Sequence, residues 1–257
     1  MTRGSSLNSA MANSSLIKRT GIVLRVTAMK EADAMVNAID EEGIFAFYAH
    51  GVKKLSSKNA SSISELALSE FVLSESSTGS LTLKEGHGQQ MLVKEDDLLS
   101  LSAALFLSEL TRTLFRDGFD GFDPEIYAWL RDCLFAMKSG AEPLTVALIY
   151  FAHALAFAGY GLDVDECVNC GAKKNIVAIS YADGGYICQN CFDADADNRT
   201  PEVQLKILRY AFRCGRADIA RIAFEAADLY PIYEGLEQYL FEATGARLKT
   251  LEFLKKI

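Results

Sequence analysis

The chain has 257 residues, half of them hydrophobic, and a formal net charge of −8 at pH 7. This length allows two domains or one large one, and the apolar content excludes a chain too polar to build a core. The acidity is uneven, because residues 1–95 hold as many bases as acids and residues 96–257 carry the whole excess of acids. The first part can therefore still present a basic face.

The longest apolar run, residues 146–160, is interrupted by His153 and Gly159 and is too short to span a membrane. Residues 1–15 are rich in Ser and Asn without a hydrophobic centre, which predicts a disordered tail rather than a signal peptide. We therefore expect a soluble, cytoplasmic protein with reduced thiols and no membrane partner.

From Leu16 the pattern predicts β-strands. Ile22, Leu24 and Val26 alternate with Val23 and Arg25, as in a strand with one wet face. Further strands are predicted over residues 35–39, 44–49, 65–75 and 80–85, with an exposed Ser- and Lys-rich loop over 55–62. Five short strands in about 75 residues suggest a small closed barrel, and a five-stranded oligonucleotide-binding (OB) fold fits that count.

From residue 96 the hydrophobic period becomes helical. Asp123 and Pro124 predict the N-cap and first position of one helix. The segment 143–157 is apolar nearly all round, as expected for the buried centre of a bundle. The other predicted helices cover residues 97–115, 201–212, 218–229, 232–243 and 247–256. The expected fold class is α+β, with an OB domain over 16–95 and a helical domain over 96–257.

Two Cys-x-x-Cys pairs interrupt the helical part, Cys167 with Cys170 and Cys188 with Cys191. This spacing is typical of a four-thiolate zinc site, in which each pair forms a tight knuckle and the intervening loop folds back to close a tetrahedron. Gly171 stands where such a knuckle often needs a positive φ. We predict one structural Zn²⁺ in a module over residues 163–196, because four thiolates leave no open position for a catalytic water.

Other uses of these residues fit less well. Disulfides need an oxidising compartment, and a thioredoxin-like site needs a single Cys-x-x-Cys beside a βαβ unit. Cys133 and Cys214 lie in apolar helical stretches and are expected to be buried thiols. His153 lies in the most apolar helix and is expected to be a core residue. No nucleophile, base and oxyanion donor come together in the pattern, so we expect no enzyme.

The barrel carries cations that suit phosphate contact. The candidate nucleic-acid-binding residues are Lys18, Arg19, Arg25, Lys53, Lys54 and Lys58. Such cations give sequence-independent, salt-sensitive binding, but an ordinary solvated surface has the same composition. Phe45, Phe47 and Tyr48 are candidates for base stacking, although aromatic residues in a strand more often belong to the core.

Several short stretches, in their order along the chain, carry a resemblance. They are Gly-Ile-Val-Leu-Arg at 21–25, Gly-Val-Lys-Lys-Leu-Ser-Ser-Lys at 51–58, Gly-Tyr-Gly-Leu at 159–162, Cys-Val-Asn-Cys-Gly at 167–171, Gly-Gly-Tyr-Ile-Cys at 184–188 and Gly-Ala-Arg-Leu-Lys-Thr-Leu at 245–251. From about Leu16 onward the chain resembles the RecO family of bacterial DNA repair proteins.

The resemblance implies an N-terminal OB domain and a helical domain with a four-cysteine zinc site. It also implies a role in recombinational repair: binding single- and double-stranded DNA, annealing complementary strands, and acting with RecR to load RecA onto strands coated by single-strand-binding protein. Such a protein is expected to be cytoplasmic and nucleoid-associated.

For the helical domain we expect an apolar groove that accepts the acidic, hydrophobic tail of single-strand-binding protein. The candidate cations are Arg112, Arg116, Arg131 and Arg209. The alternative function is a zinc-stapled scaffold for protein partners without direct DNA binding. Clustering of the barrel cations on one face favours DNA binding, and their dispersal among acids favours the scaffold.

Overall fold

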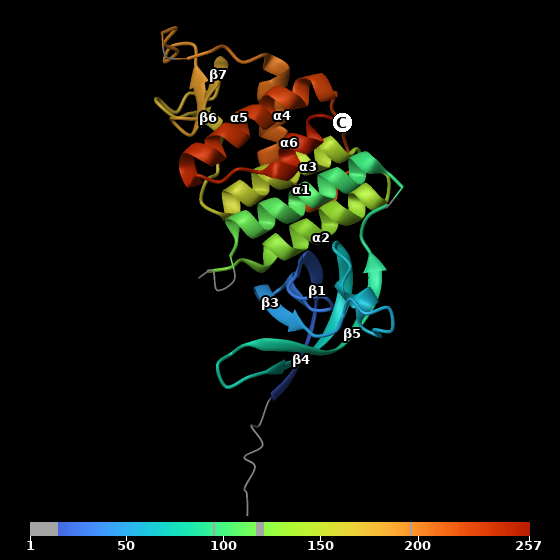
Figure 1. The fold of residues 1–257 in the computed structure, drawn as a ribbon. Coiled ribbons are helices and arrows are strands. Elements are labelled where there is room, and N and C mark those ends of the chain that lie inside the picture. Colours follow the sequence, from blue (N-terminus) through green and yellow to red (C-terminus); the bar gives the residue numbers. More distant parts are fainter. Residues whose placement is uncertain (1–14, 95, 117–120, 196) are drawn as a thin grey trace, which may run out of the picture. The chain divides into compact units, whose positions relative to one another are not determined.

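The structure, a computed structural model, describes residues 15–94, 96–116, 121–195 and 197–257. The predicted tail at 1–15 lies outside these residues except for Ser15. The chain divides into two compact units (Figure 1). The first runs to Ala38 and includes Ala46–Gln90, and the second combines Ile39–Phe45 with Met91–Ile257.

Five strands form a closed barrel in the order β1-β2-β3-β5-β4, which confirms the predicted OB-type fold class. The first strand pairs antiparallel with the fourth, from Ser15 opposite Glu75 to Ile22 opposite Leu68. The third pairs in parallel with the fifth, with Phe47 opposite Leu81. The bounds are β1 Ser15–Ala28, β2 Ala34–Asp40, β3 Gly43–Ala49, β4 Ala67–Glu75 and β5 Leu81–Met91.

The barrel core is built from the inward residues of these strands. Ile22 and Leu24 of β1 are almost fully buried, as predicted. Val23 between them is buried as well, so the prediction of one wet face is wrong at this position, and of its two predicted residues only Arg25 is exposed. Phe45 and Phe47 are buried too, and the rings of Phe47 and Phe71 lie 4.8 Å apart. The core interpretation of these two phenylalanines is therefore confirmed, because a buried ring offers no face to a base.

The helical part surrounds one apolar helix, α3, as its composition predicts (Figure 1). Tyr150 of α3 is fully buried and its hydroxyl lies 2.6 Å from Thr111 Oγ1 of α1. Asp123 caps α2 by accepting from the Glu125 N–H, and Pro124 occupies the first position as predicted. The bounds are α1 Leu98–Leu114, α2 Pro124–Lys138, α3 Pro143–Phe157, α4 Glu202–Arg213, α5 Ala226–Thr244 and α6 Lys249–Leu254.

The prediction of two helices over 218–229 and 232–243 is wrong. A short 3₁₀ turn, Arg216–Asp218, is followed by irregular chain, and then α5 runs unbroken through Pro231. Pro231 lies in the second turn of α5, where its ring removes one hydrogen bond of the helix. The buried Ile232 and Tyr233 hold the helix on α3, and the Tyr233 hydroxyl donates to the Leu144 carbonyl at 2.6 Å.

The cysteine module is a three-stranded sheet in the order β6-β8-β7, with bounds β6 Asp163–Cys167, β7 Ile176–Ser180 and β8 Gly185–Cys188. Strands β7 and β8 pair antiparallel and form a hairpin within the loop between the two Cys-x-x-Cys pairs. Strand β6, parallel to β8, was not predicted. Among the described residues, no helix combines the length and hydropathy needed to cross a membrane.

Candidate metal centre and nucleic-acid interface

Each Cys-x-x-Cys pair folds into a knuckle at the end of a strand. The Cys170 and Gly171 N–H groups donate to the Cys167 carbonyl at 3.3 and 2.7 Å, and the Cys191 N–H donates to Cys188 at 3.0 Å. Gly171 adopts φ +73°, the positive value expected at this turn.

Cys167 is the last residue of β6 and Cys188 is the last residue of β8. Because these two strands are parallel neighbours, the sheet brings both knuckles to the same end of the strands.

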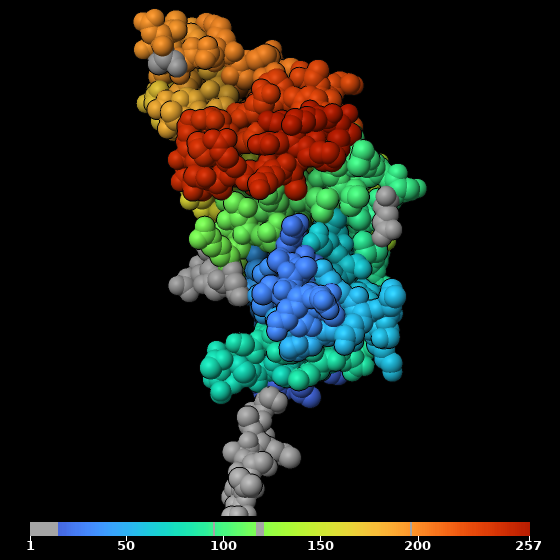
Figure 2. All heavy atoms as spheres, in the orientation of Figure 1, coloured from blue at the N-terminus to red at the C-terminus, as the bar shows by residue number. Residues whose placement is uncertain are grey.

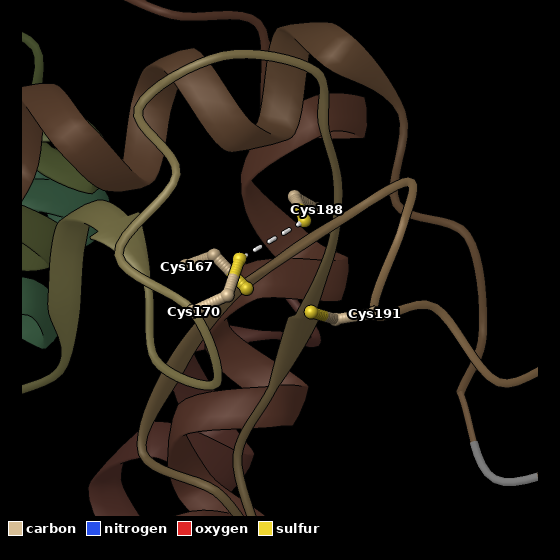
Figure 3. A group of neighbouring side chains, drawn as sticks. All are labelled: Cys167, Cys170, Cys188 and Cys191. Carbon is tan, nitrogen blue, oxygen red and sulfur yellow. Dashed lines mark hydrogen bonds between the residues drawn. The ribbon is translucent and has the colours of Figure 1, made fainter.

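The four sulfurs converge as a metal site requires (Figure 3). All four Sγ atoms lie within 4.8 Å of one another, and Cys170 Sγ lies 3.6 Å from Cys188 Sγ. Thiolates bound at about 2.3 Å in a tetrahedron stand about 3.8 Å apart. The donor set therefore fits one tetrahedral ion with four thiolate ligands and no open coordination position.

The cluster needs a cation in order to ionise fully. Burial opposes ionisation of Cys167, but the N–H groups of Cys188, Asn169 and Cys170 outweigh it and lower the pKa of Cys167 to about 6. Hydrogen bonding to Cys170 is the main cause that raises the pKa of Cys191 to about 12. The Cys167 thiolate thus forms readily while Cys191 holds its proton, and a divalent metal would remove that conflict.

Polar contacts tie the module to α4. Asp165 of β6 forms ion pairs with Arg209 Nη2 at 3.0 Å and with Arg213 Nη2 at 2.8 Å. The Tyr186 hydroxyl, at the buried centre of the sheet, donates to the Leu205 carbonyl of α4. The knuckles therefore rest on a fixed base rather than on a free loop.

A glycine of α5 makes room for the module's hairpin. A Cβ on Gly235 would lie 2.2 Å from the Tyr181 hydroxyl and 2.4 Å from Cζ of the same ring. Tyr181 follows β7, and its ring lies 6.1 Å from that of Tyr239. The helix thus accepts this tyrosine only because position 235 has no side chain.

On the barrel, cations from separate strands gather around two adjoining surface hollows. Lys18 and Arg19 of β1 line a hollow of about 410 Å³, and Lys58 and Lys84 line one of about 650 Å³. The hollows share Val72, Glu85 and His87. Two carboxylates, Glu70 and Glu85, face four cations here, so this cationic side of the barrel has a positive balance.

Lys84 and His87 were not predicted as site residues. Both belong to β5, which continues to Met91 beyond the predicted end at residue 85. The exposed Lys84 next to the buried Leu83 carries the alternating signal of a wet strand face. Barrel closure then sets this face beside β1 through β4, which lies between β5 and β1.

The loop that joins β3 to the 3₁₀ helix η1, Ala60–Ile63, is held against β5 at its C-terminal end. The Asn59 side chain accepts from the Gly86 N–H at 3.2 Å and donates to the Lys84 carbonyl at 3.4 Å. A Cβ on Gly86 would lie 2.2 Å from Ser62 Oγ, so η1 can pack on the strand only where glycine stands. This contact sets Lys58 beside Lys84.

Asp33 holds the N-terminal end of the loop between β3 and η1. Its carboxylate accepts from the Gly51 N–H and from the Tyr48 hydroxyl, both at 2.7 Å. The Lys53 N–H then donates to the Ala32 carbonyl at 2.9 Å. Lys53 and Lys54 are therefore exposed on a tethered turn, but they do not line the two hollows. The Tyr48 hydroxyl is therefore used in the hydrogen bond to Asp33 that holds this turn.

Arg25, the remaining barrel candidate, is exposed and lies 3.9 Å from Glu65. The structure therefore brings Lys18, Arg19 and Lys58 together and leaves Arg25 apart from those hollows. No described carboxylate lies within 4.0 Å of the side-chain nitrogens of Lys53, Lys54 or Lys58.

The four candidate arginines of the helical domain are dispersed. Arg131 pairs with Asp132 at 3.0 Å and Arg209 with Asp165 at 3.0 Å. Arg112 is half-buried in the last turn of α1, and Arg116 is exposed just after that helix. A hollow of about 350 Å³ beside the module is lined instead by Arg199, a cation that was not among the predicted site residues.

His153 and the remaining cysteines take up core positions, as expected. The His153 ring stacks on Trp129 at 3.7 Å, its Nε2 lies 3.1 Å from the Cys214 carbonyl, and burial lowers its pKa to about 4. Cys133 and Cys214 are buried. These residues form packing contacts rather than an acid–base site.

A closed OB barrel with a cationic side, joined to a helical domain with a four-thiolate module, defines the class of this protein. Comparison with known families then identifies the particular family. The family description "Recombination protein O N terminal" matches residues 11–88, and "Recombination protein O C terminal" matches residues 95–252. The chain belongs to the RecO family of DNA repair and recombination proteins.

Curated relatives agree over nearly the whole length. The DNA repair protein RecO of Bacillus pumilus is 28% identical over 246 residues, which cover 94% of each chain. The protein of the same name from Bacillus cytotoxicus is 30% identical and covers 93% of this chain and 97% of the relative. The suspected family is thereby confirmed, together with its general role in DNA repair and recombination.

Proposed function

We propose that this protein binds single- and double-stranded DNA through its barrel and anneals complementary strands during recombinational repair. The observation that carries the proposal is the cationic side of the barrel, where Lys18, Arg19, Lys58 and Lys84 outnumber the two carboxylates beside them. Cations on a fixed scaffold bind phosphates without reading sequence, and strand annealing needs that kind of contact. Family membership supports the same assignment.

The bound metal in this proposal is one structural Zn²⁺, held by Cys167, Cys170, Cys188 and Cys191. Four thiolates in a closed tetrahedron favour zinc over metals that prefer oxygen ligands. The ion would stabilise the knuckles and, through the ion pairs of Asp165 in β6 with Arg209 and Arg213 of α4, the adjoining helical domain. It supplies no chemistry, because its coordination is complete.

In the cell, we propose that the protein acts with RecR to load RecA onto DNA coated by single-strand-binding protein. An acidic, apolar tail of that coat protein would need a cation beside an exposed apolar side chain. Helix α2 offers both one turn apart, in Arg131 and the 54% exposed Phe135. Tail-peptide binding should weaken in Phe135→Ala but not in Phe253→Ala, where the ring is 53% exposed on α6.

The test of DNA binding is fluorescence anisotropy with labelled single-stranded and duplex oligonucleotides across a salt series. Replacing Lys53 and Lys54 together by Ala should weaken binding equally for all sequences. The slope of log affinity against log salt should fall by roughly one unit for each phosphate that is no longer neutralised. Replacing Lys58 and Lys84 should have the same effect if the hollows hold the strand. Lys173→Ala with Lys174→Ala, in the cysteine module, is the matched control.

The competing function is a scaffold for protein partners without direct DNA contact. It predicts that the wild-type protein shows no salt-dependent affinity for either oligonucleotide. That outcome would overturn DNA binding by the barrel while leaving the zinc assignment intact.

A further inference from the structure

The loop between β3 and η1 presents an apolar side chain at its tip. Leu55 is the most exposed large hydrophobic residue among those described, with a relative exposure of 110%. It follows Lys53 and Lys54 and precedes Ser56, Ser57 and Lys58. Figure 2 shows this part of the chain in light blue at the surface of the barrel.

The loop holds that side chain outward by its own backbone. The Lys54 N–H donates to the Gly51 carbonyl at 3.2 Å, and the Ser57 N–H donates to the Lys54 carbonyl at 2.9 Å. Asp33 fixes the entry to the loop through Gly51, and Asn59 fixes the exit. Two anchored ends and successive turns leave Leu55 little opportunity to fold back onto the barrel.

The surroundings of Leu55 suit DNA better than a protein pocket. The segment from Gly51 to Ser62 contains three lysines and no acid. Protein interfaces are depleted in lysine, and leucine is rarely the residue that dominates their affinity. Proteins that kink or open DNA, by contrast, hold the phosphates with cations and insert an apolar residue such as leucine between bases.

We propose that Leu55 is an apolar wedge that enters the base stack of DNA held by Lys53, Lys54 and Lys58. This inference rests on the proposed DNA binding and goes further, because it assigns the loop a role in unstacking bases. The lysines hold the backbone on both sides of the loop tip while the leucine separates neighbouring bases. An opened stack is easier to re-pair with another strand, which suits an annealing protein.

The test uses the full-length protein and oligonucleotides that contain 2-aminopurine, whose fluorescence rises when it unstacks. Wild-type protein and Leu55→Phe should raise the fluorescence on binding, whereas Leu55→Ser and Leu55→Ala should lose most of that rise. Affinity for the same oligonucleotides should fall by less than about tenfold with an unchanged salt slope, because the phosphate contacts remain. Leu98→Ser, at another exposed leucine, is the control.

A second measurement follows the residue itself. The chain has one tryptophan, Trp129, which is 5% exposed in the helical domain, so a Leu55→Trp variant adds one accessible reporter. Stacking on bases should quench the new tryptophan when DNA is added. An equal 2-aminopurine response in wild type and Leu55→Ser, with tight binding in both, overturns the wedge and leaves DNA binding standing. Absence of binding by the wild type overturns both.

Discussion

The carboxylate of Asp33 and the backbone N–H of Gly51 form a 2.7 Å hydrogen bond. It joins the end of the β1–β2 connection to the start of the lysine-containing loop between β3 and η1, called the basic loop below. Gly51 adopts φ +60°, a conformation that glycine reaches without strain. The bond therefore fixes the direction in which Lys53 and Lys54 leave the barrel.

This bond predicts an acid-sensitive loop. The Gly51 N–H and, after it, the Tyr48 hydroxyl lower the pKa of Asp33 below its ordinary value of 3.8. Because the folded-state pKa is the lower one, the stabilisation is present above about pH 4 and is lost as the pH falls through the folded-state pKa. Tyr48→Phe should raise the Asp33 pKa part of the way back, as measured by carboxyl NMR titration. An unchanged pKa would mean that the tyrosine does not donate to Asp33.

The second prediction concerns Gly235. Alanine in place of glycine usually favours a helix by about 1 kcal/mol. Here its Cβ would meet the Tyr181 ring, so we expect Gly235→Ala to reduce the free energy of unfolding by about 1–3 kcal/mol in urea titrations. In the double variant with Tyr181→Ala the loss should be smaller than the sum of the single losses. Strict additivity would show that the two residues do not meet.

Features with a local cause were predictable from the sequence. The strand around Ile22 and Leu24 follows from its apolar, β-branched residues, although the burial of Val23 does not, and the knuckles follow from Cys-x-x-Cys spacing together with Gly171. These signals need no knowledge of distant residues, because each depends on neighbours along the chain.

Features with a non-local cause were not predictable. Pro231 looks like a helix break, yet the packing of Tyr233 against α3 keeps α5 continuous. Strand β6, with three acids in five residues, lacks a strand pattern and forms because it pairs with β8. Lys84 joins Lys18 only when the barrel closes. Tertiary contacts decided each of these cases.

The third prediction concerns the metal. Purified protein should contain one zinc per chain by elemental analysis, and Cys170→Ser should lower this content sharply, because three thiolates leave the tetrahedron incomplete. Chelation should lower the melting temperature, since metal binding contributes to folding free energy in such modules. Cys214→Ala, a buried cysteine outside the cluster, should retain the zinc. Full zinc content in Cys170→Ser would exclude this sulfur as a ligand.

The last prediction separates the position of the basic loop from its charge. Gly86→Ala adds no charge, but its Cβ would lie 2.2 Å from Ser62 Oγ and 2.7 Å from Ser62 Cβ, so η1 must shift away from β5. Since Asn59 sets Lys58 beside Lys84 through the same contact, we expect weaker DNA binding. Anisotropy with single-stranded oligonucleotides measures it.

Two variants complete the experiment. Ser62→Gly in the Gly86→Ala background removes both clashing atoms and should restore affinity, because the loop can settle back on the strand. Gly79→Ala, in the β4–β5 turn, is the control: it strains a positive φ of +80° but meets no atom within 4 Å, so it should cost stability without changing affinity. Wild-type affinity in a folded Gly86→Ala protein would show that DNA binding does not depend on the position that η1 gives to Lys58.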